Sequence, residues 1–235
     1  MSTRRLDWTL ANRGAGTRKA VQKAIKAGRV SVDGQAQTDP KFKVSDAQII
    51  VFDGIEIGVL PLLLIWHKPI DVVCTMRDPF GRSDLSGAIP ESFQGRFHPV
   101  GRLDRDTSGL LLFSRSGPLT QWFLHPKRSV RRWYTAVVDG LPSNALVKQL
   151  AEGVETSLGT FPAQVHTLSG NEVILSVTEG KHRMVRRLLA NCGHPVLDLH
   201  RFRYGPIELG DLKTEHVRPI TELEMASLAE MGAPI

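Results

Sequence analysis

The segment Gly101–Phe113 constrains this chain more than any other, because an acidic, turn-forming stretch runs directly into an apolar one. Asp104 and Asp106 lie in the turn-forming part, and the apolar residues Leu110–Phe113 predict a buried strand. At the mouth of a sheet a carboxylate is held rigidly and still meets a substrate, so Asp104 is a candidate reactive group. The alternative is an Asx-turn, in which Asp, Thr and Ser side chains bond their own backbone before a strand.

Positive charge is concentrated at the beginning of the chain. The 235 residues carry a formal net charge of +6, and the first thirty hold eight Lys or Arg against one acid, Asp7. Such a cluster is the pattern expected of a phosphate-binding surface. With 41% apolar and 23% charged residues the composition is that of a globular protein. The length suits a small domain joined to a medium-sized one.

The first domain is predicted to span residues 1–56 and to contain two helices and short strands. Residues 5–12 and 17–27 have helical patterns, with Thr17 as the N-cap of the second helix and Gly28 as its end. Strands are expected at residues 29–33 and 48–52. Helical spacing leaves the basic residues of the second helix outside, which indicates an RNA-binding surface or, as the alternative, a solvated charged face.

Residues 57–61 are predicted to be a linker, and residues 62–235 a second domain. Strands and helices alternate irregularly there, with several hairpin signals, so we expect an α+β fold. Its sheet should be mixed and largely antiparallel, with flanking helices. The helices are expected at residues 117–125, 143–152, 182–192 and 221–231, and the strands at 62–66, 110–113, 132–139, 161–167, 172–178 and 196–204.

Other patterns exclude several classes of protein. Cys74 and Cys192 lack metal-ligand spacing and are expected to be buried, reduced thiols of a cytoplasmic protein, with a single disulfide as the alternative. The first ten residues contain no apolar signal-peptide region, and no apolar run approaches the roughly 20 residues that span a bilayer. Residues 14–19 lack the spacing of a phosphate loop, and no dinucleotide fingerprint is present. We therefore expect no cofactor, no metal and no membrane partner.

The predicted helix at residues 182–192 has two faces. At about 100° per residue, its apolar side chains gather on one side, with Arg183, Arg186 and Arg187 opposite. This pattern indicates either a basic stripe directed at RNA or an ordinary surface helix.

Several motifs together resemble one protein family. Gly-Arg-Leu-Asp at 101–104 with Thr-Ser-Gly-Leu-Leu-Leu at 107–112 resembles the signature of bacterial pseudouridine synthases. Lys68-Pro69 resembles the start of the family's opening strand, and Arg132-Trp133-Tyr134 resembles the segment with its active-site tyrosine. Residues 179–187 resemble its third motif. Residues 5–7, 17–20 and 28–34 resemble the small RNA-binding domain of the fourth small-subunit ribosomal protein.

The whole chain thus resembles the RsuA-type branch, whose members modify uridines in ribosomal RNA. It departs from the family pattern at His67, where Asn is usual, and at Met184, where Gln or Glu is common.

The resemblance implies a cofactor-independent isomerase that converts a uridine of ribosomal RNA to pseudouridine. Asp104 would be the catalytic carboxylate, and Tyr134 would stack on the uracil and offer its hydroxyl for proton transfer. Arg186 would be the cation that keeps Asp104 ionised. Asp106 does not occupy the signature position and is interpreted as a turn residue.

The basic residues supply the expected RNA contacts. Those predicted to bind RNA are Arg5, Arg18, Lys19, Lys23, Lys26, Arg29, Arg102, Arg183 and Arg187. Lys127, Arg128, Arg131 and Arg132 are expected to widen this surface. We expect a monomer that binds ribosomal RNA or an assembling ribosomal subunit. Residues 199–209, which include 203–207, resemble the family members that act on large-subunit RNA more closely than the others. The alternative is a non-catalytic RNA-binding or ribosome-assembly factor on the same scaffold.

Overall fold

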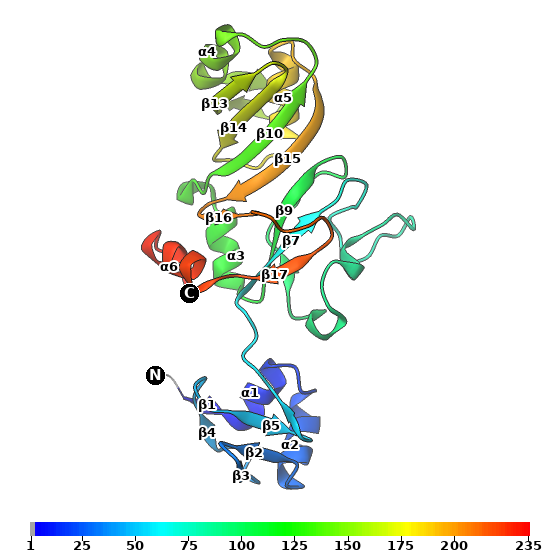
Figure 1. Ribbon diagram of the computed structural model, residues 1–235, viewed down its shortest axis with the longest axis vertical. Helices are drawn as coiled ribbons and strands as arrows, with labels where there is room; N and C mark the ends of the chain where they lie inside the picture. The colour runs from blue at the N-terminus through cyan, green and yellow to red at the C-terminus, as the bar shows by residue number, and fades with distance from the viewer. Residues whose placement is uncertain (1–2) are drawn as a thin grey trace. The chain divides into compact units, whose positions relative to one another are not determined.

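The computed structural model describes residues 3–235, apart from the side chain of Ser92, and divides into two compact units (Figure 1). The division lies between Pro61 and Leu62. Each unit has its own cluster of buried apolar residues. Within the described residues, no helix is long and apolar enough to cross a membrane.

The first unit consists of two helices and short strands, as expected. Helix α1 spans Leu6–Asn12 and α2 spans Arg18–Lys26, and the Thr17 hydroxyl caps α2 by accepting a hydrogen bond from the Ala20 amide. One antiparallel sheet has the order β3-β2-β5-β6, and β1 pairs with β4. The strands are β1 (Arg4–Arg5), β2 (Val30–Val32), β3 (Gln35–Ala36), β4 (Lys43–Val44), β5 (Ile50–Phe52) and β6 (Ile55–Glu56).

Apolar side chains from both helices meet the sheet in the core of this unit. Leu10 and Ile25 are fully buried beside Val30 and Ile50. Ile57 still belongs to this unit, because its amide donates to the Ile50 carbonyl at 2.8 Å. Burying one face of α2 leaves the basic face of that helix in solvent, where it is available to a polyanion.

The second unit is built on a nine-stranded sheet whose main path is β13-β14-β10-β15-β9-β7-β17, with β8 on β9 and β16 on β15. All pairings are antiparallel except that of β9 with β15, so the prediction of a mixed, largely antiparallel sheet is confirmed. The strands are β7 (Leu63–Lys68), β8 (His98–Pro99), β9 (Ser108–Ser114), β10 (Arg132–Val138), β13 (Gln164–Ser169), β14 (Glu172–Val177), β15 (Val196–Tyr204), β16 (Ile207–Glu208) and β17 (Val217–Pro219).

A short parallel pairing joins the two halves of this sheet. Strands β10 and β15 share seven residue pairs, but β15 and β9 share two, His200 with Ser108 and Arg201 with Gly109. We call this pairing the seam. Gly109 has φ +106°, and a Cβ there would lie 2.2 Å from the Arg201 carbonyl oxygen. The seam therefore requires glycine at this position.

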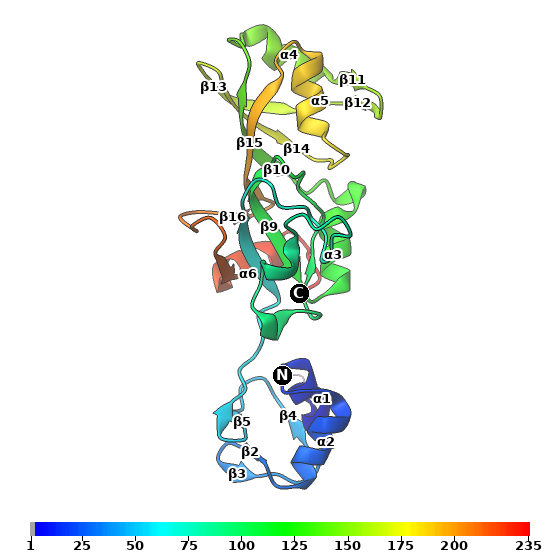
Figure 2. The same cartoon turned by 90° about the vertical axis from the view of Figure 1, so that its right-hand side faces the viewer.

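Four helices flank the sheet: α3 (Gly117–Leu124), α4 (Asn144–Glu152), α5 (Met184–Asn191) and α6 (Glu222–Glu230). Trp122 and Phe123 of α3 and Leu228 of α6 join the buried cluster formed by β7 and β9. Figure 2 shows α4 and α5 at the other end of the sheet, with the hairpin of β11 (Val154–Thr156) and β12 (Gly159–Phe161) beside α5. Three short 3-10 turns are η1 (Leu85–Gly87), η2 (Glu91–Phe93) and η3 (Pro126–Arg128).

Three expectations need correction. The strand predicted at residues 161–167 is divided, because Phe161 ends β12 and Gln164 begins β13. Helix α5 begins at Met184 and not at residue 182, because Arg183 has a left-handed backbone with φ 52°. Cys74 and Cys192 are free thiols, but they are only half-buried.

Candidate active site

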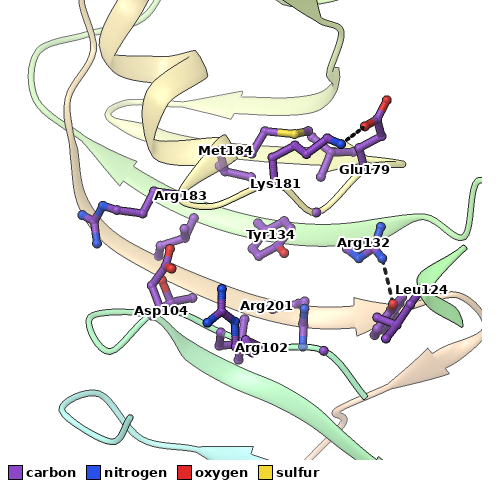
Figure 3. A pocket seen from close by; sticks show the side chains of 18 of the residues that line it. Arg102, Asp104, Leu124, Arg132, Tyr134, Glu179, Lys181, Arg183, Met184 and Arg201 are labelled. Carbon is purple, nitrogen blue, oxygen red and sulfur yellow. Dashed lines mark hydrogen bonds and ion pairs between the residues drawn. The ribbon is translucent and has the colours of Figure 1, made fainter. Parts of the chain in front are cut away.

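A pocket in the second unit straddles the seam (Figure 3). The turn before β9 lines it from one half of the sheet, and β10, β15 and the start of α5 line it from the other. The charged and aromatic residues in its lining include Arg102, Asp104, Arg132, Tyr134, Arg183 and Arg201.

A buried lysine holds the turn that carries Asp104. Lys68, the last residue of β7, is fully buried, and its Nζ donates to the carbonyls of Pro69, Arg105 and Thr107 at 2.8, 3.4 and 3.0 Å. Burial lowers the pKa of Lys68 from its ordinary value. The Thr107 amide also donates to the Asp104 carbonyl at 3.1 Å. These bonds fix the backbone of the turn and leave the Asp104 side chain free to face the pocket.

The Asp104 carboxylate is partly exposed in the pocket (Figure 3). It makes no hydrogen bond or ion pair with any other residue in the described range 3–235. A rigidly held carboxylate without a protein partner is available to attack a substrate or to take up its proton.

Tyr134 lies between Asp104 and Arg132 in the pocket (Figure 3). It belongs to β10 and is 8% exposed, and strand alternation places it on the same face as Arg132. The structure therefore brings Asp104 and Tyr134 into one pocket, as the sequence analysis expected. A buried tyrosine at this position offers a flat ring for stacking and a hydroxyl for hydrogen bonding.

Two buried arginines add positive charge to the pocket. Arg132 donates to the Thr178 carbonyl at 2.7 Å and to the Tyr204 hydroxyl at 2.8 Å, and Arg201 Nε donates to the Leu110 carbonyl at 2.9 Å. Their guanidinium carbons lie 4.8 and 5.0 Å from the Tyr204 ring centroid. Neither has an acidic partner among the described residues. Their charges therefore favour an anionic group in the pocket.

One of these arginines was expected at the outer surface, and the other was not among the candidates. Arg132 was expected among the outer RNA contacts, but it is 6% exposed. Arg201 is 2% exposed and was not singled out. The position of Arg132 two residues before Tyr134, which puts both on one face of a strand, is the signal that would have found it. No sequence pattern indicated the role of Arg201.

Arg183 and Arg186 both bind Asp106. Arg183 donates from Nη1 and Nη2 to the two carboxylate oxygens at 3.0 and 2.9 Å. Arg186 Nε lies 3.3 Å from one of these oxygens, and Nη2 donates to the Asp106 carbonyl at 2.6 Å. Its Nη1 donates to the Val196 carbonyl at 3.1 Å. Burial alone would raise the pKa of Asp106, but the two arginines lower it below its ordinary value.

This arrangement differs from the expected one. Arg186 was predicted to lie on the exposed face of its helix and to pair with Asp104, but it is 9% exposed and pairs with Asp106. Asp106 is therefore more than a turn residue. Of the two arginines, Arg183 lines the pocket together with Asp104.

Of the two other predicted RNA contacts in the second unit, Arg102 is exposed and Arg187 is half-buried. Arg102 lines the pocket beside Asp104. Arg187, on α5, donates to the Ser157 hydroxyl of the neighbouring hairpin. Both guanidinium groups remain accessible to phosphates.

The predicted cations of the first unit fall into two groups. Arg5 and Arg18 bind the buried carboxylate of Asp7, and Arg29 forms an ion pair with Asp53. By contrast, three basic side chains of α2 are exposed and have no ion-pair partner among residues 3–235. These are Lys19, Lys23 and Lys26. Of the predicted contacts in this unit, these three lysines are therefore the ones whose charge remains available to a nucleic-acid backbone.

Comparison with known families agrees with this geometry. Residues 62–191 match the RNA pseudouridylate synthase family, and residues 4–50 match the S4 domain. The chain belongs to the RNA pseudouridylate synthase family and carries an S4 domain at its beginning.

Similar proteins cover nearly the whole chain. It is 33% identical over 239 residues to ribosomal large subunit pseudouridine synthase B of Bacillus subtilis (strain 168), covering 97% of this chain and 96% of that protein. It is 35% identical over 243 residues to the protein of the same name from Escherichia coli (strain K12), covering 93% and 84%. A crystal structure of a pseudouridylate synthase superposes with a TM-score of 0.67 at 26% identity and covers 95% of this chain and 99% of that one.

Proposed function

We propose that this protein converts a uridine of large-subunit ribosomal RNA into pseudouridine. Its family supports the reaction, and the names of the relatives from Bacillus subtilis and Escherichia coli support the substrate. The reaction breaks the bond between N1 of uracil and C1′ of ribose and forms a bond between C5 and C1′. The hydrogen on C5 is lost and N1 is protonated, so the product is an isomer of the substrate.

The observation that carries this proposal is the unpartnered Asp104 carboxylate in one pocket with Tyr134. Asp104 would supply the reacting carboxylate, and Tyr134 would stack on the uracil and exchange a proton through its hydroxyl. The base must leave its stack to reach this pocket, at a cost of a few kcal/mol that contacts with the RNA backbone must offset.

The positive charges around the pocket suit this chemistry. Arg183, Arg132 and Arg201 all line it. They favour any negative charge that develops on the uracil as its bond to ribose breaks. Arg186 would act through its contacts with Asp106, which hold the turn of Asp104 in place.

RNA binding is assigned mainly to the first unit. We assign residues 1–57 to RNA affinity, residues 58–61 to a linker and residues 62–235 to catalysis, by a monomer in the cytoplasm. The exposed lysines of α2 would contact phosphates of the RNA. Arg102, Arg183 and Arg187 would contact the RNA around the pocket.

Substitution of Asp104 tests the assignment of the reacting group. Asp104→Asn should abolish pseudouridine formation in a ribosomal RNA fragment while leaving the affinity for that RNA within a few-fold, because the change removes one charge from a side chain without a protein partner. The matched control is Asp211→Asn, since Asp211 is exposed and lies outside the pocket lining. Substantial turnover by Asp104→Asn would refute the assignment.

A second experiment separates the enzyme from its alternative, a non-catalytic RNA-binding or ribosome-assembly factor. Pseudouridines in ribosomal RNA are mapped in cells with the protein, without it, and with Asp104→Asn alone. The proposal predicts that one large-subunit pseudouridine is missing both without the protein and with the variant. An unchanged map, together with defective ribosome assembly, would favour the non-catalytic factor.

A further inference from the structure

The position of Asp104 relative to Tyr134 depends on contacts across the seam. Asp104 precedes β9 in one half of the sheet, and Tyr134 lies on β10 in the other. The backbone joins these halves through two residue pairs between β9 and β15. Because this backbone pairing is so short, contacts between side chains must hold much of the alignment between the two halves.

Among the described residues, Asp106 makes the ion pairs across the seam beside the pocket. It lies in the turn before β9, whereas Arg183 and Arg186 belong to the start of α5 in the other half. Arg183 binds its carboxylate through two hydrogen bonds of 3.0 and 2.9 Å. Arg186 binds its carbonyl at 2.6 Å and the Val196 carbonyl of β15 at 3.1 Å. One acidic residue thus ties the catalytic turn to both α5 and β15.

These contacts act through geometry more than through stability. The side chains of Asp106 and Arg183 are 46% and 40% exposed, so their ion pair contributes about 1 kcal/mol or less to the free energy of folding. Arg183 nevertheless has a left-handed backbone with φ 52°, which is uncommon for a residue other than glycine. The two-pronged contact with Asp106 holds this residue in one orientation at the edge of the pocket.

We propose that Asp106 is a positioning residue for the reaction proposed above: by holding Arg183 and Arg186 across the seam, it fixes Asp104 opposite Tyr134. This inference rests on the proposed function. It gives Asp106 a role that its place in the turn did not indicate. Asp106 also determines where the arginines stand relative to Asp104, which forms no ion pair within the described residues.

Two substitutions distinguish this role from that of a turn residue. Asparagine replaces aspartate readily in a turn, but it cannot form the ion pairs with the arginines. Glutamate keeps the charge and is less suited to the turn. Asp106→Asn should lower kcat about 10- to 100-fold with KM for the RNA nearly unchanged, and Asp106→Glu should restore part of the loss. Full activity in the asparagine variant, or greater activity in it than in the glutamate variant, would overturn the proposal.

A double-mutant cycle tests whether the contact with Arg183 is responsible. Residues that act as one unit are not additive, so Asp106→Asn combined with Arg183→Gln should be no slower than the slower single variant. Losses in kcat that multiply would show that the two side chains act independently and would contradict the inference.

Hydrogen exchange gives a readout that does not depend on activity. The Thr107 amide donates to the Asp104 carbonyl, so its exchange reports on the catalytic turn. It should exchange about tenfold faster in Asp106→Asn and at an unchanged rate in Asp104→Asn. Suppose that the unaltered protein forms no pseudouridine but the exchange rates still differ in this way. The proposed reaction would then be wrong, whereas the positioning by Asp106 would stand. Unchanged exchange in Asp106→Asn would overturn the positioning itself.

Discussion

The fully buried carboxylate of Asp7 organises the basic beginning of the chain. Arg5, Gln22 and Arg18 all donate to it. Burial alone would raise the pKa of Asp7, but these donors stabilise the charged form more strongly and hold its pKa well below the usual range. Because the folded-state pKa is lowered, the charged group stabilises the fold above the unfolded-state pKa of about 3.9. This contribution is lost as the pH falls below that value towards the folded-state pKa.

Replacing Asp7 should therefore destabilise the first unit. Asp7→Asn leaves the Arg5 and Arg18 guanidinium groups without their carboxylate and should lower the free energy of unfolding by about 3 kcal/mol at pH 7. The difference in unfolding free energy between the unaltered protein and Asp7→Asn should shrink below about pH 4, because Asp7 of the unaltered protein then takes up a proton when the protein unfolds. Hydrogen exchange of the α1 and α2 amides in the full chain measures both effects. Asp53→Asn, which breaks an exposed pair with Arg29, should destabilise the unit much less, and equal losses would contradict this account.

At the scale of elements, the seam between β9 and β15 depends on one glycine. Gly109 combines φ +106° with a backbone neighbour that a Cβ would approach to 2.2 Å. Gly109→Ala should therefore force the two strands apart and destabilise the second unit by about 3 kcal/mol or more. It should also depress pseudouridine formation, because the pocket spans the seam.

Gly170→Ala is the matched control for this prediction. Gly170 also has a positive φ, +59°, but nothing lies within 4 Å of a Cβ placed there. The Gly170→Ala variant should lose only the roughly 1–2 kcal/mol of unfolding free energy expected for the backbone conformation, and it should keep its activity. Urea unfolding of the two variants gives the comparison. Equal stability losses would mean that close approach at the seam is unimportant.

At the scale of the whole molecule, affinity for RNA and chemistry are predicted to reside in different units. The exposed lysines of α2 have no acidic partner in the described chain, whereas Arg5, Arg18 and Arg29 each bind an acid. The joint replacement of Lys19, Lys23 and Lys26 by Gln should reduce the slope of log affinity against log salt by about 2 to 3. Turnover of a short RNA at saturating concentration should be unchanged. Replacing Arg29 by Gln is the comparison, because its pair with Asp53 is exposed, and a loss of slope there as large as that of the three lysines would contradict the assignment.

Much of the fold followed from local patterns in the sequence. The helical spacing of Val21, Ala24 and Ile25, with Thr17 before them, predicted α2 together with its cap. The apolar run of Leu110–Phe113 predicted the buried strand β9, and irregular alternation predicted a mixed, largely antiparallel sheet. Such features depend on neighbours a few residues apart, so the sequence is sufficient to reveal them.

The sequence by itself determined the α+β class, the two helices of the first unit and the candidates Asp104 and Tyr134. Only the tertiary structure decided which charges meet. Arg186 binds Asp106 and not Asp104, and Arg183 reaches the same acid from 77 residues away. Arg201 is buried in the pocket by a pairing of β15 with β9 that no local pattern indicates. The physical reason is that a guanidinium group selects its partner within about 4 Å, and only the folded chain determines which of several acids lies that close.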